Sequence, residues 1–270
     1  MNGADASAAH GFGRLLLAEW TKFRSVRSTL WSLVAFFFIT VGVTALLTES
    51  IVFNWTRAQA GGEPVRILAD PVSFILGAGL TLGQLTVAAL GVLMISAEYS
   101  SGLIRPSILA SPRRVLLLEA KACVLAAVLI PLTETVAFAS FFVGSVLLYA
   151  RAPVGLSDPG VLRAVIGAGL YLTVMGLFSL ALGALIRHTA GAIIAAIGVF
   201  LVLPALDGIV PGRIGADIVA CLPEQAGSLI YHSHRLPGQL LAPWEGFGVL
   251  CLWTLVMLAA AAVALELRDA

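Results

Sequence analysis

Six long apolar runs divide this sequence and constrain its fold more than any other feature. They cover residues 30–48, 74–96, 122–150, 163–186, 189–206 and 244–265. A helix needs about 20 apolar residues to cross the hydrocarbon core of a bilayer. The runs are continuous, whereas the strands of a membrane β-barrel alternate in polarity. The sequence therefore predicts an all-α integral membrane protein with six transmembrane helices.

The composition agrees with this class and excludes several kinds of partner. Of the 270 residues, 59% are hydrophobic and 11% are charged, against about 25% charged residues in soluble domains. The net charge of +1 gives no reason to expect a nucleic-acid partner. Cys123, Cys221 and Cys251 form no CxxC pair, and His232 and His234 have no third ligand nearby. We expect no metal site.

The distribution of basic residues predicts the topology of the chain. Ten of the sixteen Lys and Arg residues fall on the side of the two termini, and six fall on the other side. The positive-inside rule then places both termini in the cytoplasm and the protein in the cell membrane. We expect one domain over residues 1–270, with a cytoplasmic tail at 1–29, a cytoplasmic loop at 97–121 and an extracellular segment at 207–243.

Two segments outside the apolar runs predict further helices. In the stretch RLLLAEWTKFRSVRS, the side chains of Leu16, Trp20 and Phe23 share one helical face, which is typical of a helix lying in the membrane surface. The segment 207–243 is apolar but is cut by four prolines into pieces shorter than a span. It predicts short outer-face helices or a re-entrant element.

Glycine spacing indicates close helix packing. Gly79 and Gly83 form a GxxxG pattern in the second run, and Gly191, Ala195 and Gly198 form a small-residue stripe in the fifth. Small residues let two helices approach closely within a membrane. We interpret both patterns as packing within the bundle.

Catalytic motifs are absent from the sequence. It contains no GxSxG, no HExxH and no GxxxxGK[ST] loop, and its two lysines, Lys22 and Lys121, follow no phosphate-binding glycines. We therefore expect no catalytic residue in this chain. If the protein uses ATP, another chain hydrolyses it.

The stretch EYSSGLIRPSILASPRRVLLLEAKA follows the second run and is unusually apolar for a loop. Gly102 permits a tight break, and Ser111 followed by Pro112 is typical of a helix start. Between them lies an apolar patch of Leu103, Ile104, Ile108 and Leu109, flanked by arginines. Such a patch is buried either in the groove of a partner protein or as a hairpin on the membrane surface.

This stretch and LLLAEWTKFRSVRSTLWSL resemble the permease subunits of ABC transporters of the ABC-2 type, especially those of high-GC Gram-positive bacteria. The resemblance implies an exporter in which residues 98–110 form a coupling helix that docks on a separate ATP-binding subunit. That subunit would hold ATP and Mg²⁺, and the permease would pair with a second copy or a sister chain. The coupling residues implied are Glu98, Tyr99, Gly102, Leu103, Ile104, Arg105, Ile108 and Leu109.

Glu134 is an ionisable residue well inside the third run. An acid at that depth indicates a substrate path or an ion relay, or else a structural carboxyl that is neutral or bonded to Thr133 or Thr135. Two alternatives to the exporter follow: a secondary transporter driven by an ion gradient through Glu134, and an intramembrane enzyme. The enzyme would need paired polar residues at one depth, and the sequence offers Glu134 alone.

Overall fold

The computed structural model describes residues 3–25, 27–56, 63–100, 114–206, 213–235 and 239–267. Within these ranges every regular element is a helix. Five helices contain an apolar stretch long enough to cross a bilayer. They are α2 (Arg27–Phe53), α5 (Pro71–Ser100), α7 (Arg114–Leu148), α8 (Val161–Ile186) and α12 (Pro243–Leu267). Their length and composition indicate a multi-pass membrane protein.

The fifth apolar run, 189–206, forms a shorter and less regular element. It begins as the α-helix α9 (Thr189–Ile197), continues as the π-helical turn η1 (Gly198–Val202) and ends as the 3-10 turn η2 (Pro204–Leu206). Proline lacks the amide hydrogen that an α-helix requires, which accounts for the change at Pro204. The structure supports five spans by length, and the sixth stays a prediction.

The helices on either side of segment 101–113 are longer than the apolar runs. The helix α5 continues to Ser100, and α7 already begins at Arg114. The two ends of the expected loop 97–121 are therefore helical. The third apolar run begins only after the charged residues Glu119 and Lys121, but these residues favour helix as strongly as apolar ones do, so α7 begins before the run.

Shorter helices complete the described chain. The helix α1 (Gly3–Ser25) precedes α2, and α4 (Glu63–Ala69) precedes α5. Between the fifth and sixth runs lie α10 (Arg213–Ala220), α11 (Pro223–Ser228) and the 3-10 turn η3 (Leu229–Tyr231). Short helices were expected in this segment, since its prolines restrict helix length.

The centre of the bundle is α8, which packs against α5, α7, α9 and α12. Glycines allow the closest approaches. A Cβ atom at Gly91 of α5 would clash with the carbonyl oxygen of Gly176 on α8, and one at Gly176 would lie 2.5 Å from Leu129 Cδ1 of α7. At these two positions any side chain would push the helices apart.

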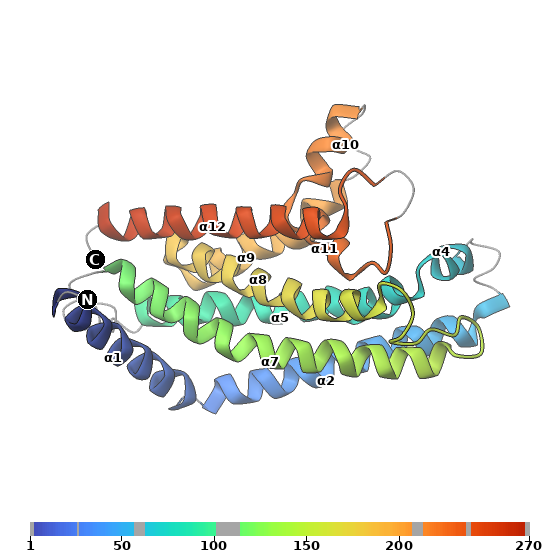
Figure 1. Ribbon diagram of the computed structural model, residues 1–270, viewed down its shortest axis with the longest axis horizontal. Coiled ribbons are helices and arrows are strands. Elements are labelled where there is room, and N and C mark those ends of the chain that lie inside the picture. The colour runs from blue at the N-terminus through green and yellow to red at the C-terminus, as the bar shows by residue number, and fades with distance from the viewer. Residues whose placement is uncertain are drawn as a thin grey trace.

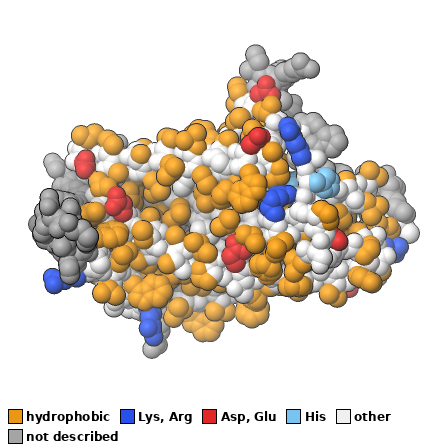
Figure 2. All heavy atoms as spheres, viewed as in Figure 1, with side chains coloured by type: hydrophobic (Ala, Val, Ile, Leu, Met, Phe, Trp, Pro, Cys, Tyr) orange, Lys and Arg blue, Asp and Glu red, His pale blue; other side chains and the backbone are white. Residues whose placement is uncertain are grey.

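The outer surface of the bundle is apolar. Figure 2 shows hydrophobic side chains along the whole length of one face, with charged side chains as separate spots. Leu46 on α2 and Leu252 on α12 are more than half exposed. A surface of this kind is stable when lipid covers it.

Both ends of the chain lie at the same end of the bundle (Figure 1). There α1 lies beside the start of α7, and α5 and α12 end close by. We call this the α1 end. The helices α5, α8 and α12 begin at the opposite end, where α4, α11 and η3 also lie.

Candidate functional site

Two glutamates and two lysines from three helices meet at the α1 end. Glu19 and Lys22 belong to α1, Glu98 to the last turn of α5, and Lys121 to the second turn of α7. Lys121 Nζ lies 2.6 Å from Glu19 Oε2 and 2.8 Å from Glu98 Oε1. Lys22 Nζ lies 2.8 Å from Glu19 Oε1 and 3.0 Å from Glu98 Oε1. Each ammonium group therefore bridges both carboxylates, and we call these four residues the charge cluster.

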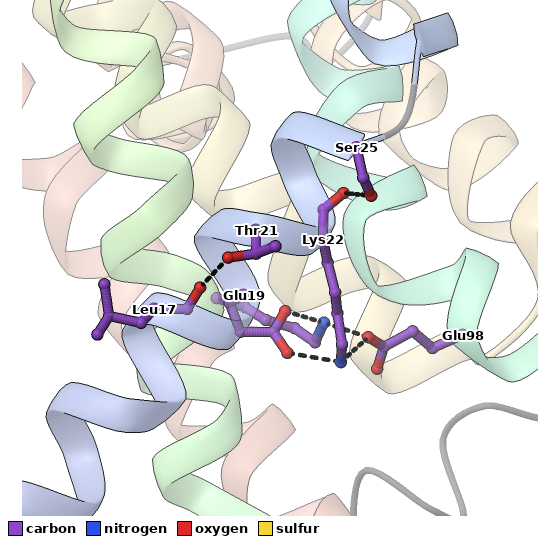
Figure 3. A network of polar contacts seen from close by, with 7 residues as sticks. Leu17, Glu19, Thr21, Lys22, Ser25 and Glu98 are labelled. Carbon is purple, nitrogen blue, oxygen red and sulfur yellow. Dashed lines mark hydrogen bonds and ion pairs between the residues drawn. The ribbon is translucent and has the colours of Figure 1, made fainter.

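The sequence of α1 places Glu19 and Lys22 on one face, because residues three apart are neighbours on a helix. Figure 3 shows both side chains directed toward Glu98. The hydroxyls of Thr21 and Ser25 instead donate to the carbonyls of Leu17 and Lys22 within α1. These hydroxyls do not compete for the carboxylates.

Most of the charge cluster is buried. The side chain of Lys121 is 1% exposed, and those of Glu19 and Glu98 are 3% and 10% exposed, while Lys22 reaches solvent. Burying an isolated ion costs several kcal/mol of hydration free energy, and only close opposite charges offset that cost. Two ammonium groups face two carboxylates, so the cluster has no net charge. Its four members stabilise one another, and removing one leaves an uncompensated charge.

The charge states of the α1 residues follow from these contacts. Burial by itself would raise the pKa of Glu19, but the ammonium groups of Lys121 and Lys22 outweigh it and hold this pKa below its ordinary value. Burial would lower the pKa of Lys22, but its bonds to Glu19 and Glu98 raise it above the ordinary value. Glu19 and Lys22 are therefore both ionised near neutral pH.

The charge cluster lies close to both ends of segment 101–113. Glu98 lies just before this segment, and Lys121 lies two turns after the start of α7. Their contact at 2.8 Å joins the two helices that carry the segment, and Glu19 joins both of them to α1. The charge cluster therefore joins α1, α5 and α7 near both ends of this segment.

A second contact holds the residue next to Glu98. The guanidinium carbon of Arg187 lies 5.4 Å from the centre of the Tyr99 ring, a cation–π distance. Arg187 ends α8 in the left-handed conformation and donates to the Ala264 carbonyl of α12 at 3.1 Å. The last turn of α5 is thus also tied to α8 and α12.

The structure places the predicted coupling residues unevenly. Glu98 and Tyr99 lie in the contacts described above. The other six fall outside the described residues, so their role stays a prediction; they are Gly102, Leu103, Ile104, Arg105, Ile108 and Leu109.

A helix, α1, covers the segment predicted to lie in the membrane surface, and that placement stays a prediction. The most buried described side chain of α1 is a charged one. Leu16 and Phe23 are partly buried, and Trp20 is 45% exposed. Glu19 is the residue that faces the bundle. The apolar pattern indicated the helix, whereas a buried ion pair determines how it packs.

Sequence reasoning did not find Glu19, Lys22, Lys121 or Arg187 as site residues. A signal was present, because Lys22 and Lys121 are the two lysines of the whole sequence and Lys22 follows a glutamate by three residues. Their pairing across α1, α5 and α7 depends on tertiary structure and is not visible in a linear pattern.

Glu134 lies in α7 beside α8. Its Oε2 atom is buried and has no hydrogen-bond partner among the described residues. The Thr133 hydroxyl donates to the Gly169 carbonyl at 2.9 Å, and that of Thr135 donates to the Pro131 carbonyl at 2.7 Å. Neither threonine bonds Glu134, so the predicted hydrogen bond is not formed, while a neutral structural carboxyl stays an alternative.

A second polar site lies at the opposite end of the bundle. Asp70, before α5, accepts from the Ser233 hydroxyl at 2.8 Å and from the Ser233 amide at 3.1 Å, and His232 Nδ1 lies 3.2 Å away. Arg163 of α8 donates to the carbonyls of Ile230, His232 and Ser233. We call this the Asp70 clasp, and it fixes residues 229–235 to α5 and α8.

No protein-family model and no curated protein sequence matches the chain.

Proposed function

We propose that this chain is the membrane-spanning permease subunit of an ATP-driven exporter. It would form the substrate pathway and bind a separate ATP-binding subunit through segment 101–113. The observation that supports this most is the charge cluster, which joins the two helices flanking the segment to α1. A partner that moves the segment would tilt three helices together, since buried ion pairs resist separation.

The remaining parts of the proposal follow from charge and topology. The run 189–206 would cross the membrane as a sixth span, which brings α12 back to the α1 end. The excess of basic residues on the side of the termini favours a cytoplasmic α1 end. The ATP-binding subunit would approach there and would hold ATP and Mg²⁺. A second permease, either another copy or a sister chain, would complete the pathway.

The test is coexpression with a candidate ATP-binding subunit, to be sought in the neighbouring reading frames. The pair is expected to copurify and, in liposomes, to hydrolyse ATP faster than the ATP-binding subunit alone. Lys121→Met is expected to reduce this stimulation strongly, because α7 then loses its ion pairs with both α1 and α5. Glu119→Gln, an exposed acid on the same helix, is the matched control. Transport by the lone chain without ATP would contradict the proposal.

A second candidate function is an ion-coupled secondary transporter. The buried and unpartnered Oε2 atom of Glu134 favours it, because such a carboxyl can take up and release a proton. This candidate predicts transport by the lone chain in liposomes with a pH gradient and its loss in Glu134→Gln. The exporter predicts a requirement for ATP and the partner.

A further inference from the structure

We infer that Glu134 binds the charged group of the cargo, and that the cargo is an organic cation with an apolar body that enters from the bilayer between α7 and α8. The inference rests on the proposed transport function and assigns it a substrate class. It depends on the depth of Glu134, the space around it, the engagement of the chain's cations elsewhere, and an opening to the bundle surface.

The first observation is the depth of the acid. The apolar stretch of α7 runs over Val115–Leu148, so Glu134 lies near its middle. Water does not satisfy polar groups at that depth. The Oε2 atom has no hydrogen-bond partner among the described residues. An ionised carboxylate there requires a positive group.

The second observation is that α8 leaves room for the carboxylate. A Cβ atom at Gly169 would lie 2.5 Å from the carboxyl carbon of Glu134 and 2.8 Å from Oε2. The carboxylate therefore packs on bare backbone. The carbonyl of Gly169 accepts from the hydroxyls of Thr133 and Thr173 at 2.9 and 3.1 Å. Both hydroxyls donate away from Glu134, so the carboxylate can accept from a guest.

The third observation is that the described Lys and Arg side chains near the spans make their contacts with groups other than Glu134. Lys121 pairs with two carboxylates in the charge cluster, and Arg163 donates to three carbonyls of the Asp70 clasp. Arg187 lies over Tyr99 and Arg151 lies over Trp55. Among the described residues, no ion pair with Glu134 is formed. A counter-ion for an ionised Glu134 would therefore come from outside the described residues.

The fourth observation is that the line of contact between α7 and α8, which we call the seam, reaches the outer surface of the bundle. Glu134 itself is only partly buried. One turn away on α7 lies Ile130, 44% exposed, and one turn from Gly169 on α8 lies Ile166, 38% exposed. Both flank the seam on the outer, apolar surface of the bundle. A guest with an apolar body would reach the carboxylate from the lipid without crossing the core.

The chemistry of such a site selects for charge. In an apolar environment, a bound cation stabilises a carboxylate far more than a neutral hydrogen-bond donor does. A negative guest would be repelled by the same group. We therefore expect discrimination by the sign of charge at constant size and shape.

The experiment measures binding of radiolabelled tetraphenylphosphonium to the isolated chain in detergent micelles, without ATP or partner. Saturable binding to the wild type is expected, with at least about tenfold weaker binding to Glu134→Gln, as for a lost charge-assisted contact. Glu119→Gln, an exposed acid on α7, should bind as the wild type does. Tetraphenylborate has the same shape and opposite charge, and its binding should not weaken in Glu134→Gln.

Gly169→Ala provides a second test that keeps the acid. The added methyl group would displace the carboxylate, so tetraphenylphosphonium binding should fall while the elution profile of the purified chain stays monodisperse. The inference would be overturned if Glu134→Gln bound tetraphenylphosphonium with wild-type affinity, or if the wild type showed no saturable binding. If the wild type showed no saturable binding but transported in response to a pH gradient, Glu134 would be a proton-binding residue instead. This binding assay contains no partner protein. If the chain failed to bind an ATP-binding subunit in a separate experiment, the exporter proposal would be refuted, but the measured tetraphenylphosphonium binding would stand.

Discussion

Lys121 Nζ lies 2.8 Å from Glu98 Oε1, although segment 101–113 separates the two residues in sequence. The same ammonium group lies 2.6 Å from Glu19 Oε2 of α1. One buried lysine thus holds together the end of one span, the start of the next and the helix that precedes the first. This relationship determines what a partner bound to the segment can move.

Replacing Lys121 should destabilise the protein strongly. Lys121→Met takes the buried ammonium group from Glu19 and Glu98 and leaves the half-exposed Lys22 beside them, and breaking a buried pair costs about 3–5 kcal/mol. Thermal unfolding of the purified chain in detergent should therefore occur at a clearly lower temperature. Glu119→Gln changes an exposed acid on the same helix and should shift stability by less than about 0.5 kcal/mol. Equal stability of the two variants would show that the buried pairs contribute nothing.

The charge cluster should also make stability depend on pH in a defined direction. The folded pKa of Glu19 lies below the ordinary value of 4.5, so its contribution is present above pH 4.5 and is lost as the pH falls through the lower folded value. The folded pKa of Lys22 lies above 10.5, so its contribution is present below pH 10.5 and is lost as the pH rises further. We expect Glu19→Gln to lose less stability than the wild type between pH 7 and pH 3. An equal loss of stability in the wild type and in Glu19→Gln over this pH range would contradict this expectation.

The Asp70 clasp should hold residues 229–235 on the bundle. Burial tends to raise the pKa of Asp70, but His232 and hydrogen bonds from Ser233 and Ser73 lower it, so the carboxylate is ionised at neutral pH. Asp70→Asn removes this charge and should cost about 1–3 kcal/mol. Hydrogen–deuterium exchange should increase in 229–235 and remain unchanged in α1. Asp217→Asn, an exposed residue of α10, is the control, and unchanged exchange in the Asp70 variant would show that the clasp is not required.

The proposed orientation can be tested with a native cysteine. Cys221 is exposed between α10 and α11, at the end of the bundle opposite to α1. With Cys123 and Cys251 changed to alanine, a membrane-impermeant maleimide should label Cys221 on intact cells. A single cysteine at Arg24, exposed on α1, should react only after permeabilisation. The reverse pattern would place the α1 end outside and exclude a cytoplasmic partner there.

Much of the fold could be predicted from the sequence, because apolar length and small-residue spacing are local properties. Five apolar runs correspond to long helices, and Gly79 and Gly83 do pack within the bundle, since a Cβ at Gly83 would lie 2.8 Å from Thr40 Oγ1 of α2. The fifth run forms a shorter helix than the others and is interrupted at Pro204. Hydropathy does not resolve such a break.

The candidate site could be predicted only in part. Glu98 and Tyr99 were named because they begin the apolar loop, and both make the contacts described above. Glu19 was overlooked because a glutamate on an amphipathic helix is normally solvated. Its partner Lys121 stands far away in sequence, and only the packing of α1 on α7 brings the two within hydrogen-bonding distance.

The most direct test of the proposed coupling role concerns Ile104 and Leu109 in segment 101–113. Changing either to aspartate places a charge in the proposed partner contact, which costs several kcal/mol when buried and weakens association tenfold for each 1.4 kcal/mol. The measurement is copurification with the ATP-binding subunit, together with its stimulated ATP hydrolysis. We predict that both fall sharply in Ile104→Asp and Leu109→Asp while the chain still inserts in the membrane. Copurification and stimulated hydrolysis at wild-type levels in both variants would contradict the account.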